Sequence, residues 1–220
     1  MAINKELVVF LEELKENNYK EWFDLNRKRY ELVKKDFLEF VSSLIIRISE
    51  FDTSVSYLKP KDCIFRINRD IRFAKDKSPY KANFGTYMVK GGKKSGNAGY
   101  YLHIEPDNCF IAGGIYAPSP SDLKLIRNEI YENPLTFKTF IENEEFVKVY
   151  GGLSGDKLSN LPRGYDKNFE FGDLLKYKHY ISFRQLDKNE IFDANFLDNL
   201  VSYFHATFSF NEYLNEIIEK

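Results

Sequence analysis

The chain has 220 residues, of which 43% are hydrophobic and 30% are charged, and its formal net charge at pH 7 is −1. This composition is that of a globular protein with a substantial buried core, and it excludes an intrinsically disordered chain. The near balance of charge excludes a protein that coats duplex DNA with its whole surface, because such proteins are basic throughout.

The cellular context follows from the cysteines and the N-terminus. Cys63 and Cys109 are the only cysteines, so we expect no disulfide framework and two reduced thiols in the core. The N-terminal stretch has acidic residues inside its apolar pattern, and it therefore predicts neither a signal peptide nor a membrane span. We expect a cytoplasmic protein that does not associate with membranes.

Residues 1–50 show helical periodicity. Apolar side chains recur every three or four residues over 3–14, which defines one face of a helix. After an interruption at Asn17-Asn18, a second apolar pattern runs from Trp22 to Ile48 and predicts one long amphipathic helix.

From residue 62 to residue 116 the pattern is typical of antiparallel strands joined by short loops. Apolar and polar side chains alternate over 62–73, with Arg69 as the one interruption on the apolar side. Further strand-like runs lie at 83–90, 99–105 and 109–116. Pro106-Asp107 predicts a tight turn between the last two runs, in a register that places Leu102 beside Ile111.

The rest of the chain predicts helices over 119–145, an extended loop region over 150–172, and a return strand followed by a C-terminal helix over 179–220. Ser119 can cap the first of these helices, with Pro120 at its first position. No low-complexity linker or internal repeat divides the sequence. The predicted fold is α+β, a single domain with a central antiparallel sheet flanked by N-terminal and C-terminal amphipathic helices.

The most unusual segment is RINRDIRFAKDKSPYK at 66–81. It contains six cations and two carboxylates, a net charge of +4, so the rest of the chain carries −5. Guanidinium groups form paired hydrogen bonds to phosphate or carboxylate and stay charged at cellular pH. The candidate ligand-binding residues are Arg66, Arg69, Arg72, Lys75, Lys77, Tyr80 and Lys81. The structural alternative is an internal network in which Asp70, Asp76 and acids elsewhere pair with the arginines.

Arg69 has two readings of its own. If the alternation over 62–73 holds, its side chain points towards the apolar face and needs a carboxylate from a distant segment. We favour this architectural role. If the strand stops near Asn68, Arg69 and Asp70 lie in a loop and Arg69 is available to a ligand.

The acid–base inventory is short. Asp70, Tyr80 and His103 are the candidate catalytic residues, and His103 is expected to share one strand face with Tyr101 and Glu105. The glycine-rich segment 90–99 lacks the spacing of a phosphate-binding P-loop and predicts a hairpin loop. No metal-ligand or nucleophile motif is present, so the sequence predicts no cofactor and no protein-held metal.

The run Arg66-x-x-Arg69-Asp70-x-Arg72-Phe73, followed by Asp76-Lys77 and Tyr80, resembles the signature of a bacterial family of unknown function, domain of unknown function 2461. Three other stretches are also similar to that family: Asn17-Asn18 with Trp22-Phe23, Gly113-Gly114-Ile115-Tyr116, and 161–165. The resemblance covers most of the chain. It implies a shared fold and shared charged positions, and it implies no activity.

Two functional hypotheses follow. In the first, the protein has one pocket for a small anionic ligand that carries phosphate or carboxylate, such as a nucleotide or metabolite; whether it is also an enzyme, of unknown reaction, is left open. In the second, it is a non-catalytic module whose basic strip binds RNA or an acidic partner protein. We expect the small ligand over nucleic acid; the oligomeric state is left open. A pocket where Arg66, Arg72 and Tyr80 converge favours the first, and exposed Phe73, Tyr80 or Tyr87 on a basic face favours the second.

Overall fold

Helices occupy the N-terminal part of the chain in the computed structural model, which describes residues 1–220. They are α1 (Lys5–Glu16), α2 (Lys20–Leu25) and α3 (Arg27–Ile48), followed by the 3-10 turn η1 (Thr53–Val55) and the short α4 (Pro60–Cys63). Asn4 caps α1 because its side chain accepts a hydrogen bond from the backbone N–H of Glu6. The apolar face predicted over 3–14 is buried.

The long helix predicted from Trp22 to Ile48 is two helices, separated at Asn26. The Asn26 side chain donates to the carbonyl of Trp22 at 3.0 Å, and its backbone leaves helical geometry with φ −97° and ψ 8°. A side-chain amide that bonds to a local carbonyl competes with the helix ladder. The apolar period continues across this break, which is why the pattern alone did not reveal it.

The sheet has five strands in the order β1-β2-β3-β5-β4. Their bounds are β1 (Phe84–Val89), β2 (Gly99–Ile104), β3 (Phe110–Ile115), β4 (Leu153–Ser154) and β5 (Tyr180–Gln185). The antiparallel sheet, with amphipathic helices from both ends of the chain, confirms the predicted α+β class. The return strand falls at β5, inside the range expected for it.

The turn between β2 and β3 is the predicted one. The backbone N–H of Asn108 donates to the carbonyl of Glu105 at 3.2 Å and closes the turn around Pro106-Asp107. The rings of His103 and Phe110 stack with centroids 4.5 Å apart, as expected for residues opposite each other in this register. Leu102 and Ile111, the expected neighbours on the other face, are both fully buried.

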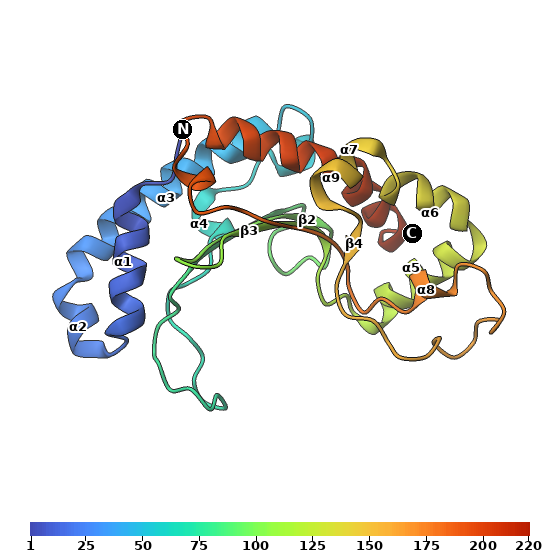
Figure 1. The fold of residues 1–220 in the computed structure, drawn as a ribbon, viewed down its shortest axis with the longest axis horizontal. Helices are drawn as coiled ribbons and strands as arrows, with labels where there is room; N and C mark the ends of the chain where they lie inside the picture. Colours follow the sequence, from blue (N-terminus) through green and yellow to red (C-terminus); the bar gives the residue numbers. More distant parts are fainter. The chain divides into compact units, whose positions relative to one another are not determined.

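The strand predicted over 62–73 is absent. Cys63 ends helix α4, and only isolated bridges follow, at Ile64 with Thr86 and at Asn68 with Tyr80. Phe73, expected on the apolar side, is 95% exposed. Between α4 and β1 the chain instead forms a long loop that extends away from the sheet (Figure 1).

The second half of the chain is mostly helical. Its elements are α5 (Pro120–Glu132), α6 (Pro134–Ile141), α7 (Glu144–Tyr150), the single turn α8 (Gly172–Leu175), the 3-10 turn η2 (Glu190–Phe192) and α9 (Phe196–Ile218). Ser119 caps α5 through a hydrogen bond from the backbone N–H of Asp122, with Pro120 at the first helical position. None of the helices combines the length and apolar character needed to span a membrane.

Two compact units can be distinguished by the contacts within them. Unit 1 contains Met1–Met88, Tyr101–Ile111 and Gln185–Ser202, and unit 2 contains Val89–Tyr100, Ala112–Arg184 and Tyr203–Lys220. The loop that extends from the sheet belongs to unit 1, and so do Tyr101, His103 and Glu105. The two glycine-rich stretches, 90–99 and 113–114, belong to unit 2.

The core of unit 1 is rich in aromatic rings. Phe84 of β1 packs against Phe37 of α3 with centroids 5.1 Å apart, and Phe40 stacks on Phe196 of α9 at 5.8 Å. Helices therefore cover the Phe84 face of the unit 1 strands. Tyr101 and His103 lie on the opposite face, where they are hydrogen-bonded to each other.

The β2–β3 hairpin provides a test of the core. Leu102→Ala should lower the free energy of unfolding by about 2–5 kcal/mol, because it leaves a cavity at a fully buried position. Lys94→Ala, at an exposed position in the 90–99 loop, is the matched control and should have little effect. Urea unfolding measures both, and equal losses would contradict the packing described for Leu102.

Candidate active or binding site in unit 1

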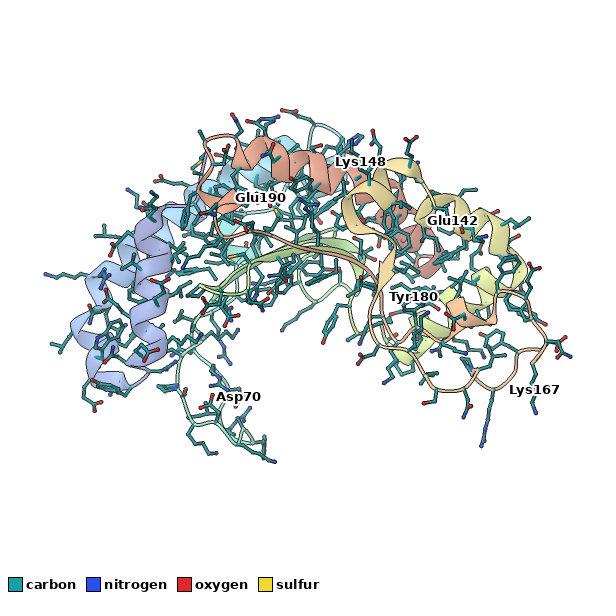
Figure 2. All side chains as sticks on the ribbon, viewed as in Figure 1. Asp70, Glu142, Lys148, Lys167, Tyr180 and Glu190 are labelled. Carbon is teal, nitrogen blue, oxygen red and sulfur yellow. The ribbon has the colours of Figure 1, made fainter.

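The loop at residues 66–81, called here the arginine loop, has a paired stem and an irregular tip. In the stem, the backbone N–H of Arg69 donates to the carbonyl of Pro79 at 2.9 Å, and that of Lys81 donates to Ile67 at 2.8 Å. The tip comprises residues 70–78. Figure 2 labels Asp70 on this loop and shows side chains projecting from both of its arms.

The stem is fastened to the N-terminal helices by Tyr80. Its ring stacks on Phe23 of α2 with centroids 4.0 Å apart, and it is buried. The side chain of Asn18 accepts from the backbone N–H of Tyr80 and donates to its carbonyl, both at 3.0 Å. Burial raises the pKa of Tyr80, so this phenol stays protonated at neutral pH. Tyr80 is therefore suited to anchoring the loop, and not to the proton transfer considered for it.

Arg69 braces the loop from within. Its Nη1 donates to the carboxylate of Asp76 and, at 3.2 Å, to the carbonyl of Ser78. Asp76 also accepts from the backbone N–H and the hydroxyl of Ser78 at 2.9 and 2.7 Å. These bonds from Ser78, followed by the one from Arg69, hold the pKa of Asp76 far below its usual range, so Asp76 is a carboxylate.

The architectural role expected for Arg69 is therefore wrong on two points, the origin of its carboxylate partner and the burial of its side chain. The carboxylate comes from seven residues along the same loop, and the Arg69 side chain is 28% exposed. Paired backbone extends to residue 69, and the chain beyond it belongs to the loop tip, close to the alternative in which the strand stops near Asn68. Only Nη1 is used, so the Nε and Nη2 edge of the guanidinium has no protein acceptor.

Arg72 and Asp70 form a second local pair. Arg72 Nε and Nη2 donate to the two carboxylate oxygens of Asp70 at 2.9 and 2.7 Å, the two-bond geometry that arginine prefers. The Arg72 side chain is 77% exposed. Arg72, with a smaller contribution from Arg66, lowers the pKa of Asp70. Asp70 is therefore an ionised and already paired carboxylate, unsuited to act as a general acid.

A hollow of about 290 Å³, called here the stem hollow, lies at the base of the arginine loop. Its lining includes three cations, one carboxylate and two anchoring residues: Lys15, Arg69, Lys81, Asp76, Asn18 and Tyr80. Of the candidate ligand-binding residues, the hollow brings together Arg69, Tyr80 and Lys81. Arg66, Arg72, Lys75 and Lys77 do not line it.

Lys15 and Asn18 were not among the candidates from the sequence. Lys15 lies on the exposed side of α1, where it pairs with Asp107 at 3.1 Å, and nothing in its local pattern distinguishes it from a solvated lysine. For Asn18 the sequence offered one indication, its place in the interruption between two helical patterns. Both join the site through tertiary packing.

The tip of the loop presents cations to solvent. Lys77 Nζ donates to the carbonyl of Ile71 at 3.0 Å, and Lys75 is exposed without a carboxylate partner, as is Arg66 at the start of the loop. The Arg72 guanidinium lies 5.9 Å from the centroid of the Phe73 ring. An apolar ring 95% exposed between cations is a surface that packing within the chain does not explain.

His103 lies at a different place, in a row on β2. Its Nδ1 is 2.9 Å from the Tyr101 hydroxyl and its Nε2 is 3.1 Å from the Glu105 carboxylate. Burial lowers the pKa of His103 despite the opposing effect of Glu105, so the imidazole is neutral at pH 7. The row is the strand face expected from the sequence, and His103 does not line the stem hollow.

The glycine-rich stretches of unit 2 have structural explanations. The backbone N–H of Gly113 donates to the Ser182 hydroxyl at 3.1 Å, and that of Gly114 donates to the Asn211 side chain at 2.7 Å. A Cβ on Gly113 would lie 2.6 Å from Thr207, so only glycine fits there. Segment 90–99 joins β1 to β2 as the expected hairpin loop, and Asn97 donates across it to the carbonyl of Lys90.

These observations define an α+β protein with a braced cationic loop and a small cation-lined hollow. The chain belongs to the family described as conserved hypothetical protein (DUF2461), whose sequence model matches residues 6–213. No curated protein and no solved structure matches the chain. The family supplies no activity, so function has to be argued from the site.

The bracing role of Arg69 can be tested by proteolysis. Arg69→Ala should speed chymotrypsin cleavage after Phe73, because the loop tip loses its internal support. The urea midpoint should change little, because the ion pair joins two residues of one loop and its Asp76 side is 61% exposed. Lys75→Ala is the control for cleavage rate. A large fall in the midpoint with unchanged cleavage would contradict this bracing role.

The row on β2 predicts a pH dependence. Because burial lowers the pKa of His103, the unfolded chain binds a proton first as the pH falls below about 6.5. The contribution of neutral His103 to the free energy of unfolding is fully present above that pH. It is lost as the pH falls through the lower pKa that His103 has in the folded protein. His103→Gln removes the imidazole, so the variant should not show this loss. The difference in free energy of unfolding between wild type and variant should therefore shrink as the pH is lowered from about 7.5 to about 5. Urea unfolding across this range measures it, and a constant difference would contradict it.

Proposed function

We propose that this protein binds a small ligand through a phosphate group held in the stem hollow. The observation that carries the proposal is the lining of that hollow, where Lys15, Arg69 and Lys81 meet with Asp76 as the one carboxylate among the charged groups. The three cations come from three places in the sequence, namely α1 and the two arms of the arginine loop. A ligand that carries negative charge would balance them.

Arg69 supports the proposal most directly. Asp76 engages Nη1 alone, and the Nε and Nη2 edge is the edge that binds two oxygens of one phosphate or carboxylate. The Asp76–Ser78 bonds hold the guanidinium in place before a ligand arrives. A preorganised cation loses less conformational freedom on binding than a free arginine.

Lys15 and Lys81 would supply further contacts. Lys15 pairs with Asp107, but both side chains are about half exposed or more, so exchanging this partner for a ligand costs little. Three cations around one group suit phosphate better than carboxylate, because a phosphate group presents more oxygen acceptors than the two of a carboxylate. The volume of about 290 Å³ is at the small end of ligand sites, enough for a phosphate and part of its bearer.

Binding, not catalysis, is the function this geometry favours. Asp70 is ionised and paired with Arg72, Tyr80 is buried and protonated, and His103 lies outside the hollow. None of the three candidate proton-transfer groups is therefore placed to act on a ligand in the stem hollow.

Calorimetry and thermal unfolding with inorganic phosphate and a nucleoside monophosphate test the proposal. At about a hundred times its dissociation constant, a ligand should stabilise the protein by about 2.7 kcal/mol, which is a rise in Tm of about 5–10 °C for a chain of this size. The double change Lys15→Gln and Lys81→Gln should abolish the rise, whereas Lys94→Gln, exposed and outside the hollow, should preserve it. Absence of binding, or binding that survives the double change, would refute the proposal.

A further inference from the structure

From the tip of the arginine loop we infer that the phosphate bound in the stem hollow belongs to a single-stranded nucleic acid, with Phe73 stacking on one of its bases. This inference rests on the proposed function, and it adds the class of ligand. The stem hollow accounts for Arg69, Tyr80 and Lys81, but not for the exposed cations of the tip or for Phe73.

The charges of the loop extend from stem to tip. The two acids of the loop are neutralised by Arg69 and Arg72, and Arg66, Lys75 and Lys77 have no carboxylate partner. The cations therefore occur at intervals from residue 66 to residue 81, and the stem hollow lies at one end of the series. A linear chain of phosphates can contact such a series along its length, whereas a single small anion can occupy only one point of it.

The exposed ring of Phe73 narrows the class of polyanion that would fit the loop. A ring that is 95% exposed is open to a ligand, and it projects from the loop tip, residues 70–78, where the other exposed side chains are charged. The Arg72 guanidinium beside it, at 5.9 Å, is paired with Asp70 through its edge, and its planar face can stack on the same base. Base stacking on such a ring needs a base that is not already stacked in a duplex, which favours a single strand.

An anionic membrane is the main competing occupant for a basic loop with an exposed aromatic ring. A membrane surface would meet the tip and would leave the stem cations, Arg69 and Lys81, without a role. An acidic protein would match the charge, but it does not require a flat ring to stack on. Single-stranded nucleic acid uses both the charges and the ring.

Fluorescence anisotropy with a labelled single-stranded oligonucleotide of about a dozen residues tests the inference, beside a duplex of equal length and inorganic polyphosphate. Phe73→Ala should weaken oligonucleotide binding about 5- to 100-fold, the equivalent of one lost base stack, and leave polyphosphate binding unchanged. Leu135→Ala, at another exposed apolar position, should change neither. Phe73→Trp should retain binding, and its fluorescence should be quenched by the oligonucleotide.

A salt titration should distinguish the contribution of phosphate contacts to affinity from that of base stacking. The double change Lys75→Gln and Lys77→Gln should lower the slope of log affinity against log salt by about 1.4, near 0.7 for each lost phosphate contact. Equal weakening of oligonucleotide and polyphosphate by Phe73→Ala would overturn the stacking role. Phe73-dependent binding to phosphatidylserine vesicles without oligonucleotide binding would also overturn the inference. If inorganic phosphate binds in the hollow but no oligonucleotide binds, the proposed function stands and this inference alone fails.

Discussion

The site depends on one anchoring interaction, the pairing of the Asn18 side chain with the backbone of Tyr80. A carboxamide that both accepts from an N–H and donates to the carbonyl of the same residue replaces the strand neighbour that this backbone lacks. The stacking of Tyr80 on Phe23 adds apolar burial at the same point. Without this anchor the stem would have only a few backbone bonds to offset the conformational entropy of the loop.

The charges of the loop beyond this anchor divide into two groups. Arg69 and Arg72 each pair with an acid of the loop itself, and these pairs set its shape. Asp76 has a further role, since its bonds to Ser78 form a turn that returns the chain towards Pro79 and the stem. Arg66 and Lys75 have no carboxylate partner, so a ligand could engage them without breaking a pair, whereas Arg69 would engage it through the edge that Asp76 leaves open. The two interpretations of the segment, anion site and ion-pair network, therefore meet at Arg69, which pairs with Asp76 through Nη1 alone.

Much of the fold was predictable because local patterns and tertiary structure agree there. The cap at Ser119 and the turn at Pro106-Asp107 contain the residue types that their geometry requires. The strand expected over 62–73 failed for a physical reason. Alternation reports only the polarity of the side chains. The cation Arg69, at a position expected on the apolar side, was the sign that the strand does not continue. The stem hollow was only partly predictable, because Lys15 and Asn18 reach it through packing between segments distant in sequence.

A chain with a net charge of −1 can still bind a polyanion, because electrostatic attraction acts over a short range. Exposed charges more than about 8–10 Å apart are largely screened at physiological salt, so the +4 of the arginine loop acts more strongly on a nucleic acid bound there than distant acids do. The acids elsewhere oppose contact over the rest of the surface. Such a protein should bind few phosphates and therefore bind weakly to nucleic acid in general. Its discrimination would then come from Phe73, which contributes only where a base is free to stack. A duplex would retain the phosphate contacts but lose that contribution, so on this proposal a preference for single strands would follow from one exposed ring.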